Sequence, residues 1–286
     1  MSDVDADQVS GTVSASQPGG VVGASQVRGT VGARLAQPQA NLWTPAQLGS
    51  DLALWLDVWD SPFDLRTDGG TDYVERWGDL SGNGHDATQA TGSEQPVLDN
   101  AVKCGNRHLV VGDLQEVAGV DAFTVFALYK VRTSGSFEMV MSKVKQKDGE
   151  FEIRRNDDDT LFTQTETTNN LFARQLGGSL LSGEIALHVS EYDGATFRQR
   201  QDGDTVSSKP LTGTTLDSSF ELAIGHRLNG DFSGNVDIWA AVVATVDQAV
   251  LIEGWAAHAA DRELGITEPL NNLPSSHPYK DDPPRV

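Results

Sequence analysis

The chain has 286 residues, of which 38% are hydrophobic and 22% charged, so it can bury a core and is neither collagen-like nor wholly disordered. Its 41 acidic residues outnumber its 21 basic ones, and the formal net charge of −20 repels phosphate backbones, so no nucleic-acid partner is expected. The single cysteine, Cys104, excludes an internal disulfide, and without an apolar stretch near 18 residues no membrane insertion is expected.

Residues 1–41 are expected to form an extended arm. They contain no aromatic residue and no Lys, so they cannot bury enough apolar surface to fold alone. Glycines recur every nine residues at positions 11, 20 and 29, and the apolar side chains of this repeat are Val13, Val22, Val31 and Leu35. Such a repeat can pair with the sheet edge of another chain or pack with copies of itself. We expect an arm bound in an assembly, with a flexible linker as the alternative.

A folded domain is expected over residues 42–286, because all six Trp, all ten Phe and all four Tyr lie there. Short segments rich in Val, Ile, Phe and Leu are typical of strands. They include residues 122–131, 149–154 and 184–192. Asp193-Gly194 and Asp202-Gly203 are typical of tight turns, so successive hairpins and antiparallel sheets are predicted.

Helical periodicity becomes convincing only near the end of the chain. It predicts one helix over residues 247–264, with Asp247 as its N-cap and Trp255 on its apolar face. Gly265 is placed to end this helix, because glycine readily adopts the left-handed conformation of a C-terminal cap. Residues 265–286 then form a tail.

Two blocks of sequence resemble a known family. Leu54-Trp55-Leu56-Asp57 and residues 74–90 are similar to the opening of concanavalin A-like (laminin-G-like) jelly-roll domains, which are common in tailed-virus (phage) and bacterial surface proteins. Residues 234–243, 252–258 and 273–280 are similar to the last strand, terminal helix and tail of that family. The resemblance implies an all-β, two-sheet antiparallel jelly-roll sandwich with one C-terminal helix. It implies little chemistry, because this fold occurs in lectins, glucanases and structural modules.

The family's glucanases would need two carboxylates that face one glycosidic bond. They supply these from an E-x-D-x-x-E strand, and the nearest match here begins at Glu191 and Asp193 but has Thr196 where the second Glu belongs. Glu150 and Glu152 also lack the pattern and are interpreted as the polar face of a strand. We therefore expect no catalytic residues and no enzymatic activity.

One loop has oxygen-bearing side chains at alternate positions. Asp79, Ser81 and Asn83 precede Gly84 and resemble the first half of a calcium loop. Position twelve of such a loop would be Ala90, so the bidentate Glu is absent, and the Asn-Gly pair is explained as a tight turn. Calcium is the alternative to a plain turn, and no other metal or cofactor is expected.

Trp43 and Trp59 are the candidate glycan contacts. Sugar binding on a jelly roll uses an exposed aromatic ring, on which the C–H faces of a sugar stack. Trp55, Trp77 and Trp239 lie in strand-like segments that match the family and are expected in the core. For Trp43, which follows the arm, anchoring the arm is the alternative role.

The arm, the single jelly-roll domain and the missing carboxylate pair together predict a structural virion protein of a tailed virus. It would be a capsid decoration, head-fibre or tail-associated protein, assembled in the host cytoplasm. Residues 1–41 would dock onto capsid or tail subunits, the protein would be a homo-oligomer, and the sandwich would face host-surface glycans. The alternative is a carbohydrate-binding lectin or adhesion module without a virion role.

Overall fold

The computed structural model describes residues 42–286 with the exception of 134, 146–147, 170 and 229–231. The arm residues Val13, Val22, Val31 and Leu35 lie outside the described residues, so the assembly role expected of them stays a prediction.

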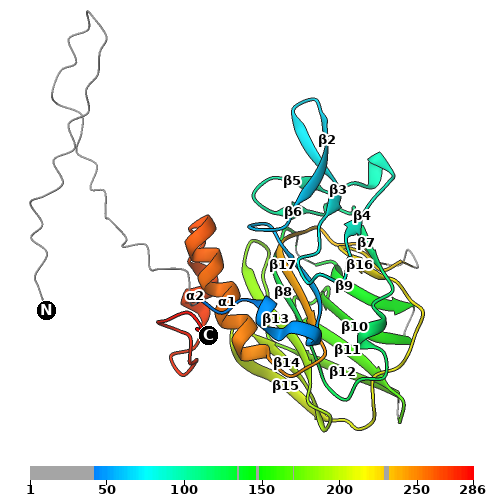
Figure 1. The fold of residues 1–286 in the computed structure, drawn as a ribbon, viewed down its shortest axis with the longest axis vertical. Helices are drawn as coiled ribbons and strands as arrows, with labels where there is room; N and C mark the ends of the chain where they lie inside the picture. Colours follow the sequence, from blue (N-terminus) through cyan, green and yellow to red (C-terminus); the bar gives the residue numbers. More distant parts are fainter. Residues whose placement is uncertain (1–41, 134, 146–147, 170, 229–231) are drawn as a thin grey trace, which may run out of the picture. The chain divides into compact units, whose positions relative to one another are not determined.

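The described strands form two layers, and all pairings between them are antiparallel (Figure 1). The helix-side layer contains, in spatial order, β1 (Leu52–Asp57), β17 (Val236–Ala244), β8 (Phe123–Val131), β13 (Ile185–Tyr192), β14 (Thr196–Gln201) and β15 (Asp204–Pro210). The second layer contains β7 (Leu109–Gly112), β16 (Leu222–Ile224), β9 (Glu138–Lys145), β10 (Asp148–Arg155), β11 (Leu161–Thr167) and β12 (Leu171–Gly177). Five further strands connect the two layers, with β4 paired to β7 and β6 paired to β17: β2 (Phe63–Asp68), β3 (Thr71–Trp77), β4 (Ala87–Thr88), β5 (Val97–Leu98) and β6 (Val102–Lys103).

The two Asp-Gly turns are hairpin connections, as predicted. Asp202 and Gly203 join β14 to β15 as a two-residue turn, and both have positive φ (51° and 90°), which a type I′ turn requires. In the turn between β13 and β14, the Asp193 carboxylate accepts hydrogen bonds from the backbone N–H groups of Ala195 (2.9 Å) and Thr196 (2.7 Å). Local turn chemistry therefore sets the register of three consecutive strands.

Strand β8 shows how the sequence builds two cores. Val125, Ala127 and Tyr129 point into the core between the layers, whereas Phe126 and Leu128 point to the other face of the same strand. Because side chains alternate along a strand, only a strand that is covered on both faces carries such a continuous apolar run.

The second core lies between the helix-side layer and the C-terminal helix α1 (Ala249–Ala259) (Figure 1). Trp255 of α1 packs edge-on against Trp55, with ring centroids 5.8 Å apart. Trp55, Trp77 and Trp239 are all buried, which confirms their predicted core positions.

The helix differs from the prediction at its start. The N-cap is Gln248 rather than Asp247, and α1 begins at Ala249. A π-helical turn (Ala260–Leu264) continues it to Gly265, which has φ 65° and ends the helix as predicted. A short helix, α2 (Glu268–Asn272), follows in the tail. The predicted fold class, an all-β antiparallel sandwich with a C-terminal helix, is confirmed.

No helix in the described part of the chain is both long enough and apolar enough to span a bilayer.

Candidate functional site

The loop that contains Asp79, Ser81 and Asn83, for which calcium binding is the alternative to a plain turn, is held in place by hydrogen bonds. Asp79 Oδ1 accepts from the backbone N–H groups of Trp55 (3.0 Å) and Ser81 (2.9 Å). Asp79 Oδ2 accepts from Ser81 Oγ (2.6 Å) and from the backbone N–H of His85 (3.1 Å). Because a carboxylate has about four acceptor sites, this one is saturated by the protein itself.

Asn83 completes the loop in the same way. Its Nδ2 donates to the carbonyls of Leu52 (2.8 Å) and Ala53 (3.1 Å) at the start of β1. Among the residues that the structure describes, no group of three or more His, Cys, Asp or Glu is arranged to hold a metal ion. Asp79, Ser81 and Asn83 therefore fasten the loop to β1 through hydrogen bonds within the protein.

The two candidate glycan-contact tryptophans pack in the protein. Trp43 is only 7% exposed, and its backbone N–H donates to the Pro284 carbonyl (2.8 Å), so the expectation of an exposed ring there is wrong. Trp59 is half-buried and packs edge-on against Trp255, with ring centroids 5.7 Å apart. The physical reason is the second core, which needs large apolar side chains to cover the outer face of β1 and β17.

Glu191 and Asp193 also have structural partners. Glu191 is 4% exposed and lies 3.5 Å from Arg198 on the neighbouring strand, and burial raises its pKa to about 7. Asp193 accepts hydrogen bonds within its turn and pairs with Arg198 at 2.5 Å.

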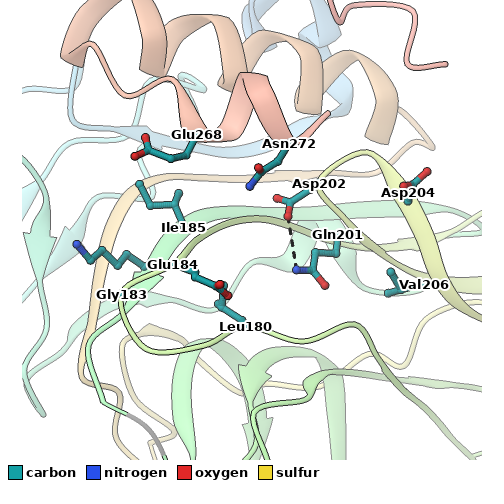
Figure 2. A pocket seen from close by; sticks show the side chains of 11 residues that line it. Leu180, Gly183, Glu184, Ile185, Gln201, Asp202, Asp204, Val206, Glu268 and Asn272 are labelled. Carbon is teal, nitrogen blue, oxygen red and sulfur yellow. Dashed lines mark hydrogen bonds between the residues drawn. The ribbon is translucent and has the colours of Figure 1, made fainter. Parts of the chain in front are cut away.

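A pocket of about 690 Å³ opens between the helix-side layer and α2. Figure 2 shows Glu268 and Asn272 coming from α2 on one side, and Leu180, Glu184 and Ile185 on the opposite side. Four further labelled residues, Gln201, Asp202, Asp204 and Val206, come from the type I′ turn between β14 and β15 and the strands beside it. The turn and the short helix thus form its two rims.

Four polar side chains of this pocket have no partner among the described residues. The side chains of Lys130, Asp204, Glu268 and Asn272 form no hydrogen bond or ion pair with any residue in the described part of the chain. Their hydrogen-bonding capacity is therefore available to a ligand or to water.

Three other polar residues of the pocket form its fixed frame. Asp202 Oδ1 accepts from the Leu187 backbone N–H (2.9 Å), and Gln201 Nε2 donates to the Ser179 carbonyl (2.9 Å). Glu184 Oε2 accepts from the backbone N–H of Leu181 (2.8 Å). Burial raises the pKa of Asp202 to about 6, so this carboxyl still carries most of its negative charge at neutral pH.

Apolar side chains supply the rest of the lining. Leu180 is buried, and Ile185 and Val206 are half-buried at the pocket wall. The polar side chains of the pocket outnumber these three, so hydrogen-bonding groups dominate its lining.

A second pocket of about 480 Å³ adjoins the first, and Lys130 lines both. Trp239 lies in its wall at a β-bulge, where the register of β17 against β8 shifts between Ile238 and Ala240. Most charges of this second pocket are paired internally, as in the hydrogen bond from Arg132 Nε to Asp237 Oδ1 (2.5 Å). The unpaired polar groups are concentrated in the first pocket and at Lys130.

This pocket could not be predicted from the sequence. The Asp202-Gly203 turn was recognisable, but only as a hairpin connection. Lys130 lies far in the chain from Glu268 and Asn272, which stand at the two ends of α2, so only the folded structure brings Lys130 beside them.

No protein-family model matches the sequence, and no curated protein matches it. Among solved structures, the chain is similar to the binding domain of Paraclostridial mosquitocidal protein 1 (13% identity, 70% of this chain and 50% of that chain, TM-score 0.50). It is also similar to the botulinum neurotoxin serotype D binding domain (10% identity, 71% and 49%, TM-score 0.50). The chain thus spans about half the length of these structures. At this identity the likeness establishes a shared β-sandwich fold.

Proposed function

We propose that this protein is a carbohydrate-binding module that holds a saccharide unit in the pocket beside α2. The observation that carries the proposal is a pocket lined by three unpartnered hydrogen-bond acceptors and one ammonium group, together with three apolar side chains. Hydroxyl groups of a sugar donate to carboxylate and amide oxygens such as those of Asp204 and Asn272, and accept from an ammonium such as that of Lys130. The C–H groups of the sugar would lie against Ile185.

The charges of the pocket favour a neutral or amino sugar. Asp204 and Glu268 are carboxylates without a protein partner, and Lys130 is the pocket's only cationic lining residue in the described chain. A carboxylated or sulfated sugar would meet this negative pocket on a chain of net charge −20. We therefore expect anionic glycans to bind more weakly than neutral ones of the same size.

The fold supports the proposal at a coarse level, since two structures with the same sandwich are binding domains of toxins. This function is the alternative that the sequence left open. The tailed-virus role depends on residues 1–41 and stays a separate prediction. Deleting those residues should leave a folded domain that no longer incorporates into particles, and normal incorporation would refute the arm's role.

A glycan array probed with the intact chain tests the proposal. We expect binding to a set of neutral or amino-bearing glycans, and binding to none would overturn it. The Asn272→Ala variant should then bind the strongest glycan about tenfold more weakly, because it loses a hydrogen-bonding amide. Asn271→Ala is the matched control, since Asn271 lies on the same helix but does not line the pocket.

A further inference from the structure

Three ionisable side chains meet at a buried position of the second layer, away from the pocket. Lys143 on β9 has a side-chain exposure of 0%, and its Nζ donates to Asp113 Oδ1 at 2.6 Å and to Glu150 Oε1 at 2.8 Å. A third hydrogen bond goes to the backbone carbonyl of Ser218 (3.1 Å). The ammonium group is thus enclosed between two carboxyl groups.

The strand register creates this arrangement. Gly149 pairs with Val144 and Glu152 pairs with Ser142, so a bulge places Glu150 beside Lys143. Asp113 directly follows β7, which is separated from β9 by the short strand β16. The cluster therefore joins two strands that are not hydrogen-bonded to each other.

From this geometry we propose that Lys143 and Asp113 become joined by an intramolecular amide (isopeptide) bond. Lys143 passes one ammonium proton to the Asp113 carboxylate, which leaves a neutral amine and a carboxylic acid. The amine nitrogen then attacks the Asp113 carboxyl carbon. Glu150 accepts the second proton from that nitrogen and delivers it to the departing hydroxyl. The products are the amide and one water molecule, and Glu150 returns to its starting state.

The distance suits the attack. A nitrogen 2.6 Å from a carboxyl oxygen lies at most about 3.8 Å from the carboxyl carbon, because the C–O bond adds about 1.2 Å. That is close to the separation of about 3–3.5 Å at which reacting groups are poised. The reaction also removes the positive charge of Lys143, whose side chain is fully buried, together with the negative charge of the partly exposed Asp113.

Glu150 is held where a proton carrier is needed. Its Oε1 accepts from the backbone N–H of Ser218 (3.0 Å) as well as from Lys143, and its Oε2 accepts from Ser218 Oγ. Burial raises the pKa of Glu150 above its ordinary value, which favours proton uptake by this carboxylate at neutral pH.

Intact-mass measurement of the purified chain tests the proposal. The isopeptide bond lowers the mass by about 18 Da, the mass of one water molecule, relative to the sequence. Tryptic digestion should yield a branched peptide in which residues 108–130 are joined to residues 133–145, because trypsin does not cleave after an acylated Lys143. A full-length mass equal to that of the sequence, or unlinked peptides, would overturn the proposal.

Variants distinguish the isopeptide bond from other reactions that also lose one water molecule. Asp113→Asn should lose about 17 Da, since ammonia replaces water as the leaving group, and Asp113→Ala should lose nothing. Glu150→Gln should retain the full mass of its sequence, whereas its linkage at the wild-type rate would contradict the role of Glu150. If a variant does not fold, the wild-type branched peptide alone still decides whether the bond exists.

Discussion

The guanidinium group of Arg200 on β14 holds the carboxylate of Glu253 on α1 through hydrogen bonds of 2.8, 3.1 and 3.3 Å. Glu253 has a side-chain exposure of 0%, so Arg200 rather than water compensates its negative charge. His277 Nε2 lies 3.6 Å from Glu253 Oε2. This ion pair fastens α1 to the sheet, and α2, which forms one rim of the pocket, follows α1 in the chain.

Arg200→Ala should lower the free energy of unfolding by about 3–5 kcal/mol, because it leaves the buried Glu253 charge unpaired. Chemical denaturation measures this loss. The double variant Arg200→Met with Glu253→Leu should be more stable than Arg200→Ala, since it removes both charges. A double variant as unstable as the single one would show that the pair acts through packing alone.

Asp202→Asn should stabilise the protein at neutral pH. Burial raises the folded-state pKa from 3.8 to about 6, so the folded chain binds more protons than the unfolded chain between these values. The contribution of Asp202 to the free energy of unfolding therefore falls as pH rises from about 4 to 6, by at most about 3 kcal/mol.

Asn keeps an acceptor for the Leu187 N–H without the charge, and tolerates the positive φ of this turn. In thermal denaturation, the variant and the wild type should have similar melting temperatures near pH 4. Near pH 7 the variant should have the higher melting temperature. An equal difference at both pH values would contradict the raised pKa.

Gly254→Ala should destabilise the packing of the tail on α1. A Cβ at Gly254 would lie 2.6 Å from Tyr279 Cβ, although alanine is otherwise the better helix former. We expect a loss of about 1–3 kcal/mol in denaturant unfolding. Gly92→Ala is the control, because its Cβ would meet Arg66 at an ordinary 3.5 Å. Equal effects of the two variants would refute the close approach of the tail.

The Asp79 loop should be independent of calcium. A chelator should leave the melting temperature unchanged, whereas Asp79→Ala should cost about 1–3 kcal/mol because the buried N–H of Trp55 loses its acceptor. Differential scanning calorimetry measures both effects. A melting temperature that falls with chelator and recovers with added calcium would show that the loop binds the ion.

The sequence predicted those features that are encoded locally. The turn at Asp202-Gly203 needs positive φ, and the apolar run of β8 needs cover on both faces, so hairpins and a layered β fold could be inferred. Charged strand residues were misleading. Glu150 and Glu152 were interpreted as the polar face of a strand, and both are buried.

Their burial depends on partners distant in the sequence. Arg227 Nε donates to Glu152 Oε2 at 2.9 Å, and the backbone N–H of Ser218 donates to Glu150 Oε1 at 3.0 Å. No local pattern specifies such pairs. The pocket escaped prediction for the same reason, because tertiary packing alone assembles its rims.

Carbohydrate binding in this pocket is tested most sharply by a crystal structure of the chain with the strongest neutral saccharide found on the array. We expect a sugar ring bounded by Asp204, Asn272 and Ile185, with Lys130 near one of its hydroxyl groups. A sugar found on another face, such as the outer surface of β10–β12, with the pocket beside α2 free of sugar, would contradict it.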